Sequence, residues 1–170
     1  MLANNIRELL IRQVNEELYS AYLYLGFVNN LKTKGLDGFA HWYKIQIYEE
    51  IDHAMLFRDY LINCNETVEL MPIETEDVTD LDVSAILIKG LKHEEHVTDL
   101  INTIYNAVAD IRDFRTKKFL DWFVNEQAEE EVNALELLTK FELYGTEPHG
   151  LYLLNNELGE RQYEKPSLVL

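Results

Sequence analysis

Four long stretches of this chain carry apolar residues at helical spacing, and each is interrupted near its middle by a side chain that can bind a metal ion. Apolar residues that recur every three or four positions predict amphipathic helices. A carboxylate on the apolar face of a helix is rarely buried without a partner. Four interruptions therefore need a common cause, and a cation site inside a helical bundle provides one.

The sequence predicts five helices and one long connection. Capping and stop residues mark several helix ends, among them Asn5 before the first helix and Gly35 and Gly145 after the first and fourth. Pro148 is favourable in the first turn of a fifth helix. We expect a single domain over residues 1–170, with a crossover loop at about 65–80 and helices at about 5–34, 37–64, 81–109, 113–143 and 148–158.

The lengths of the connections predict the topology. Short links near residues 35–37 and 110–113 join antiparallel neighbours. A helix of about 28 residues is roughly 42 Å long, and about 15 extended residues reach roughly 50 Å. The loop between the second and third helices can therefore cross the whole bundle. We expect an all-α four-helix bundle with one long crossover, parallel second and third helices, and a short C-terminal fifth helix.

The candidate ligands share one level of the predicted bundle. The first ligand on each helix lies about 12 to 14 residues after the helix start, close to the midpoint. A midpoint keeps its level whether the helix points up or down, so all four helices bring a ligand to one layer. The set is Glu17, Glu50 with His53, Glu94, and Gln127 with Glu130.

This ligand set favours iron or manganese over zinc, because it is rich in carboxylates and contains one imidazole. Two cations that share a bridging carboxylate would offset the mutual repulsion of the buried acids. Glu50 is the candidate bridge, because its i, i+3 partner His53 is the imidazole of the set. A single Glu-x-x-His pair is weak evidence for a metal site, because chance alone places about one acid three residues before a histidine in this chain. The joint pattern on four helices carries the prediction.

Other residues near the layer allow two interpretations each. Glu49, Glu126 and Glu129 lie beside the ligands and could form an accessory iron site, or be ordinary exposed glutamates. Tyr24 lies two turns after Glu17, where it could be a redox-active phenol or a core tyrosine. We expect structural or surface roles for the other histidines: His41, His93, His96 and His149.

Charge and composition exclude several classes of protein. A formal net charge of −16 argues against nucleic-acid binding and fits cationic ligands, although an acidic surface alone explains it too. We expect no membrane span and no secretory signal, because no apolar window is long enough and the N-terminus lacks a leader pattern. The lone Cys64 excludes a cysteine-rich metal cluster. Together these features favour the cytoplasm.

Five blocks of sequence carry a family resemblance. They are NEELYSAYLY at 15–24, GFAHW at 38–42, EEIDHA at 49–54, KHEE at 92–95 and FLDWFVNEQAEEE at 119–131. With these motifs the chain resembles non-haem bacterial-type ferritins over nearly its whole length. The resemblance implies an iron-storage ferroxidase that uses dioxygen or hydrogen peroxide and stores ferric oxide in a hollow shell of about 24 subunits.

The resemblance also implies roles for the candidate residues. One iron would be held by Glu17, Glu50 and His53. A second would be held by Glu50, Glu94 and Glu130, with Gln127 close by. A third, accessory position corresponds to Glu49, Glu126 and Glu129, and Tyr24 lies beside the centre. The short fifth helix would line fourfold axes of the shell.

Some positions differ from related groups. Bacterioferritins carry Glu-x-x-His on both paired helices, whereas this chain has Gln127-x-x-Glu130. Ile51 or Asp52 stands where a haem-ligating methionine would be, so we expect no haem. A di-iron peroxidase or oxygenase with a non-iron substrate is the main alternative function. A shell protein with an inactive centre would need missing ligands, and none is missing here.

Overall fold

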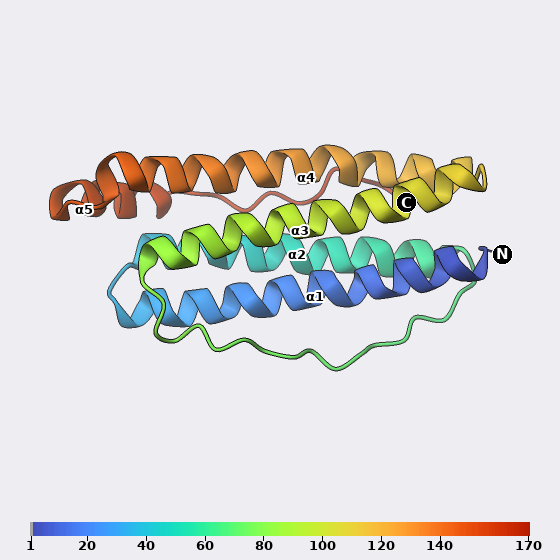
Figure 1. The fold of residues 1–170 in the computed structure, drawn as a ribbon, viewed down its shortest axis with the longest axis horizontal. Helices are drawn as coiled ribbons and strands as arrows, with labels where there is room; N and C mark the ends of the chain where they lie inside the picture. The colour runs from blue at the N-terminus through green and yellow to red at the C-terminus, as the bar shows by residue number, and fades with distance from the viewer. Residues whose placement is uncertain (1) are drawn as a thin grey trace.

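The computed structural model describes residues 2–170, which form an elongated bundle of helices (Figure 1). The elements are α1 (Asn4–Thr33), α2 (Asp37–Asn63), α3 (Val83–Asp110), α4 (Phe114–Lys140), a π-helical turn η1 (Phe141–Gly145) and α5 (Pro148–Leu158). Residues 2–170 contain no strand, so the all-α prediction is confirmed. Within the same range, no helix combines the length and apolar character needed to span a bilayer. The predicted domain also includes Met1, which lies outside the described residues.

The crossover loop runs along α1 from one end of the bundle to the other (Figure 1). Two buried asparagines of α1 hold its backbone. Asn15 Nδ2 donates to Glu69 O at 3.2 Å, and Asn15 Oδ1 accepts from Met71 N at 2.8 Å. Farther along, Asn30 Nδ2 donates to the carbonyls of three loop residues at 2.7–3.0 Å: Val78, Thr79 and Leu81. The loop delivers α3 to the end where α2 began, so α2 and α3 are parallel as predicted.

Two helices begin at aspartates that cap them. Asp82 Oδ1 accepts from Ala85 N at 2.8 Å, and Asp113 Oδ1 accepts from Thr116 N at 3.1 Å. Each bond satisfies a backbone N–H that the first turn leaves without a helical partner. The expected cap at Asn5 was wrong, because α1 starts one residue earlier, after Ala3, and Asn5 already lies inside the first turn.

The end of the fourth helix also differs from the prediction. The α-helix ends at Lys140, and the chain continues to Gly145 as a π-helical turn. Apolar spacing does not distinguish the two kinds of turn over five residues. The turn buries Phe141 edge-on against Phe39, with ring centroids 6.4 Å apart. A side chain at Gly145 would lie 2.6 Å from the Phe141 ring, so the glycine permits this packing.

The core consists of two hydrophobic clusters separated by the polar layer. The first, at the α5 end, includes Phe27, Phe39 and Leu154. The second, at the other end, includes Leu10, Phe57 and Phe123. Along each of the four long helices, the candidate ligands lie between the residues that contribute to these clusters. The layer is therefore enclosed by apolar packing above and below.

Candidate metal centre

All six candidate ligands of the layer are buried in the bundle interior. Their exposed fractions are between 1% and 4%: Glu17, Glu50, His53, Glu94, Gln127 and Glu130. Four helices supply them, so the fold brings together side chains that are far apart in sequence. Four carboxylates at this depth repel one another and lose hydration, which is costly unless a cation or a proton compensates.

Glu17, Glu50 and His53 form a group that could hold a cation. One donor atom from each lies within 4.8 Å of the other two. The His53 Nδ1 atom is 3.3 Å from Glu50 Oε2. Glu17 Oε2 is buried and accepts no hydrogen bond from the described residues. An unsatisfied carboxylate oxygen beside a second carboxylate and an imidazole fits a divalent transition metal.

His53 also belongs to a second group of potential ligands, with Glu126 and Glu130. Its Nε2 atom lies 3.9 Å from Glu126 Oε1, while its Nδ1 faces Glu50. The imidazole therefore stands between the buried layer and the side of the bundle where Glu126 is half-exposed. This position connects the centre with the neighbouring acidic residues.

The three accessory glutamates gather around one cavity of about 530 Å³. Glu49 and Glu126 are half-buried in its wall, Glu129 is exposed, and His53 and Glu130 also line it. The structure thus brings the predicted accessory residues to one place next to the layer. The cavity lies on the side of α2 and α4, and residues that follow α5 complete its lining.

Glu94 is held by hydrogen bonds from two other helices. The Tyr24 hydroxyl of α1 donates to Glu94 Oε1. The amide Nε2 of Gln127 on α4 lies 3.3 Å from Glu94 Oε2 and 3.4 Å from the Glu94 carbonyl. Gln127 therefore acts as a donor that orients a candidate ligand, and both Glu94 oxygens are engaged.

Two glutamines that the sequence analysis did not identify orient other candidate ligands. Gln13 Nε2 donates to Glu17 Oε1 at 2.9 Å. Gln46 Nε2 donates to Glu130 Oε2 at 2.8 Å, across from α2 to α4. A signal was present in the sequence, since each glutamine lies four residues before a candidate ligand on the same helical face. Amide donors restrain the carboxylates without adding charge.

Burial raises the pKa values of the carboxyl groups in the layer. The pKa of Glu17 is raised and that of Glu50 is raised well above 4.5, in both cases mainly by loss of hydration. Burial, together with the charge of Glu130, raises the pKa of Glu94 to about 8. A cation favours the ionised form of a nearby carboxyl. Metal binding at this layer should therefore release protons.

Tyr24 lies among other aromatic rings beside the layer. Its ring packs edge-on against His93, with centroids 5.8 Å apart, and tilted against Tyr43 at 5.4 Å. Burial and then the charge of Glu94 raise the Tyr24 pKa well above 10, so the phenol is protonated. His93 is buried, and its Nε2 lies 2.7 Å from Ser20 Oγ. A structural role fits this histidine.

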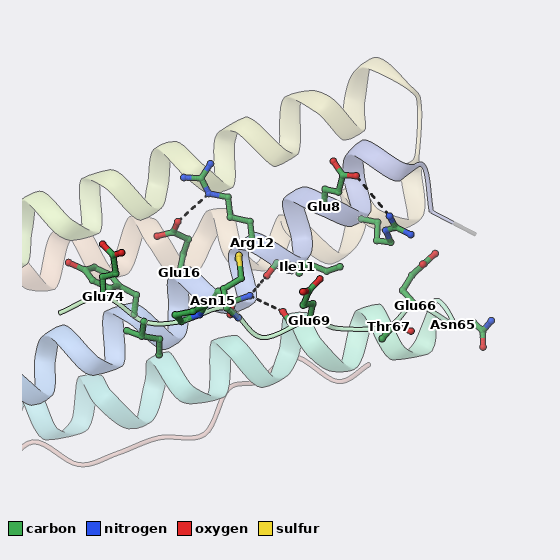
Figure 2. Close-up of a pocket in the computed structure, with 15 residues that line it drawn as sticks. Glu8, Ile11, Arg12, Asn15, Glu16, Asn65, Glu66, Thr67, Glu69 and Glu74 are labelled. Carbon is green, nitrogen blue, oxygen red and sulfur yellow. Dashed lines mark hydrogen bonds and ion pairs between the residues drawn. The ribbon is translucent and has the colours of Figure 1, made fainter.

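A larger cavity, of about 820 Å³, lies elsewhere, between α1 and the crossover loop. Figure 2 shows Arg12 and Glu16 paired on its wall, 3.2 Å apart, with Asn15 reaching toward Glu69 of the loop. None of the ten candidate residues named from the sequence lines it. This cavity is therefore not the candidate metal site, although it is the larger of the two.

Comparison with known proteins agrees with this geometry. Residues 7–144 match the ferritin-like domain family. The chain is 33% identical over 153 residues to a bacterial non-heme ferritin of Campylobacter jejuni, covering 90% of this chain and 92% of that protein. It is 30% identical over 164 residues to a bacterial non-heme ferritin of Bacteroides fragilis, covering 95% and 100%.

Solved structures show the same similarity. An open-pore ferritin from the hyperthermophilic archaeon Archaeoglobus fulgidus superposes with a TM-score of 0.93 at 35% identity, covering 95% of this chain and 100% of that chain. A humanized archaeal ferritin also has a TM-score of 0.93, at 34% identity. The likeness extends over the whole bundle and includes the helices that carry the buried layer.

Proposed function

The chain belongs to the ferritin-like domain family, and we propose that it stores iron after oxidising Fe(II) at the buried layer. The group of Glu17, Glu50 and His53 carries this proposal. Its donors are chemically suited to iron, its carboxylates are buried, and one carboxylate oxygen has no other partner among the described residues. Iron is thus the substrate of the centre as well as the stored material.

We infer that the layer takes up two Fe(II) ions, with Glu50 between them. Glu17, Glu50 and His53 would bind one ion, and Glu50, Glu94 and Glu130 the other. Each Fe(II) gives up one electron, so a pair supplies the two electrons that reduce dioxygen to hydrogen peroxide, or hydrogen peroxide to water. Hard oxygen ligands stabilise Fe(III) more than Fe(II), which favours the oxidation.

The chain's own residues prepare this reaction in three ways. The carboxyl groups of Glu50 and Glu94 lose their protons as cations arrive. Amide donors restrain the carboxylates, so little reorganisation is needed when iron binds: Gln13 on Glu17, Gln46 on Glu130 and Gln127 on Glu94. The Tyr24 hydroxyl donates a hydrogen bond to Glu94 Oε1 and so fixes the position of this ligand.

We further propose that ferric ions leave through the accessory cavity of Glu49, Glu126 and Glu129 and mineralise inside a shell of about 24 subunits. Large apolar side chains exposed on the surface support self-association. They include Tyr22 and Leu25 of α1, and Leu70 and Met71 of the crossover loop. The short α5 would meet its symmetry mates at fourfold axes, and the protein would work in the cytoplasm.

Replacement of one central ligand tests the proposal. Glu50→Ala removes the bridging carboxylate, and stopped-flow absorbance should show loss of rapid Fe(II) oxidation in a protein of unchanged assembly mass. Glu142→Ala, on η1 and away from the layer, is the matched control and should oxidise Fe(II) at the wild-type rate. Rapid oxidation by the Glu50→Ala protein would refute the proposed centre.

A further inference from the structure

The last eleven residues of the chain, 160–170, follow α5 and contain no helix or strand after the turn at residues 159–160. This C-terminal segment leaves α5 and returns along the bundle toward the end that carries the N-terminus (Figure 1). The Tyr163 hydroxyl donates to Asp52 of α2. Trp122 Nε1 of α4 donates to Ser167 Oγ at 3.1 Å, and Leu168 packs against the second hydrophobic cluster. The segment is therefore attached to both α2 and α4 along its length.

Arg161 is the most strongly held residue of the C-terminal segment. Its Nη2 lies 2.8 Å from Glu49 Oε2, and its Nη1 donates to the Trp42 carbonyl at 3.2 Å. The guanidinium also lies 4.6 Å from the centroid of the Trp42 ring, and the Arg161 carbonyl lies 2.8 Å from His41 Nε2. Side chains of Arg161 and Glu49 are 20% and 17% exposed, so water screens their attraction only partly.

The C-terminal segment also forms one wall of the accessory cavity. The opposite wall is made by Glu49, Glu126, Glu129 and Glu130. Residues of the segment that line the same cavity are Arg161, Gln162, Glu164, Lys165, Pro166 and Ser167. A cation leaving the buried layer on this side therefore meets the segment directly, and it meets Glu49 already paired with a positive charge.

We propose that the C-terminal segment closes the accessory cavity and that Arg161 competes with a metal cation for Glu49. This inference rests on the proposed function, because it takes the accessory glutamates as cation ligands. Arginine remains charged at every physiological pH. Its pairing with Glu49 therefore ends when a competing cation or a proton binds the Glu49 carboxylate, or when the segment moves away. Arg161 is thus a positioning residue that acts through Glu49.

Competition of this kind is reciprocal. If the closed segment weakens cation binding at Glu49, then a bound cation weakens closure by the same factor. Filling of the accessory site should therefore release Arg161 and loosen the C-terminal segment. The cavity would open when a cation is present there, and remain covered when the accessory glutamates are empty of metal.

Zinc titration of the metal-free assembled protein tests the competition, because Zn²⁺ binds such ligands without redox chemistry. Isothermal titration calorimetry should show that Arg161→Gln tightens the weaker class of sites about tenfold, as expected for loss of a charge-assisted hydrogen bond. Lys165→Gln removes the same charge from the same cavity wall and should change the affinity less than about threefold. Equal affinities for the two variants would overturn direct competition.

Hydrogen–deuterium exchange tests the release of the segment. Amides of residues 160–170 should exchange faster when zinc saturates the wild-type protein, and this change should vanish in Glu49→Gln. Unchanged or slower exchange on saturation would overturn the proposal. The result is distinguishable from failure of the proposed function, which would appear as rapid Fe(II) oxidation by Glu50→Ala whatever the zinc affinity of the Arg161→Gln protein.

Discussion

The Tyr24 hydroxyl donates a hydrogen bond to the Glu94 carboxylate and so joins α1 to α3 in the middle of the bundle. A second polar contact, between Ser20 Oγ and His93 Nε2, joins the same two helices. The Tyr24–Glu94 contact places a protonated phenol directly beside a candidate iron ligand.

Tyr24→Phe should slow Fe(II) oxidation and destabilise the metal-free protein. Loss of the hydroxyl leaves Glu94 Oε1 without its donor, at a cost of about 1–3 kcal/mol, and a less well-oriented ligand could slow oxidation up to about a hundredfold. Stopped-flow kinetics and thermal unfolding measure the two effects. Tyr43→Phe removes a neighbouring buried phenol and is the control. Similar behaviour of the two variants would show that the Tyr24–Glu94 bond has no special role.

Glu94→Gln should stabilise the metal-free protein at pH 8 but not at pH 5. The pKa of Glu94 is raised from 4.5 to about 8 in the fold, mainly by burial. A raised pKa means that the folded state binds the proton more tightly, so this stability is present below pH 4.5 and is lost as the pH rises to 8. Glutamine does not ionise and avoids the loss. Thermal unfolding of both proteins across this range would give a pH-independent difference if the inference is wrong.

Sequence and structure agree best where a long-range pattern defines the feature. The bundle, the parallel α2 and α3 and the level of the ligands follow from helical period and loop length, which are averaged over many residues. The boundary at Lys140 was missed because a π-helical turn leaves no mark in apolar spacing. Details of one turn depend on tertiary packing, here on Phe141.

Contacts between distant residues of the site were harder to predict from the sequence. The pairing of Gln46 with Glu130 spans 84 positions, and the pairing of Arg161 with Glu49 spans 112. No local sequence pattern identifies either pair, because an acidic chain offers each amide or arginine many possible carboxylate partners. Helical phase predicts that a side chain faces the core, but rotamers and neighbouring helices decide which oxygen it meets.

Gln127→Glu should lower the unfolding temperature of the metal-free protein and make it depend more strongly on added metal. The substitution removes a donor to Glu94 and places a further negative charge beside it. A divalent cation would compensate for that charge, so the stabilisation by Zn²⁺ should exceed that of the wild type. Gln127→Met removes the donor without adding charge. If both variants respond to zinc equally, charge at this position is not the controlling factor.

Asn155→Ala should detach α5 from the start of α2. Asn155 Oδ1 accepts from the backbone N–H groups of Gly38 at 2.8 Å and Phe39 at 3.3 Å, and α2 has no side-chain cap of its own. Loss of a helix cap costs about 1–2 kcal/mol, which chemical denaturation of the assembled protein can measure. Asn156→Ala, at an exposed neighbouring position, should be nearly neutral. Comparable losses in both variants would contradict capping by Asn155.

The separation of the two hydrophobic clusters has a consequence for how this molecule unfolds. Each end of the bundle keeps its own apolar packing, whereas the cross-section between them holds buried carboxyl groups whose ionisation costs stability. Without metal, and at a pH where these groups ionise, we expect subglobal opening to begin at the centre of the fold rather than at its ends. Iron that enters the layer reverses this order. The stored substance would then also be the ligand that makes the two halves behave as one cooperative unit.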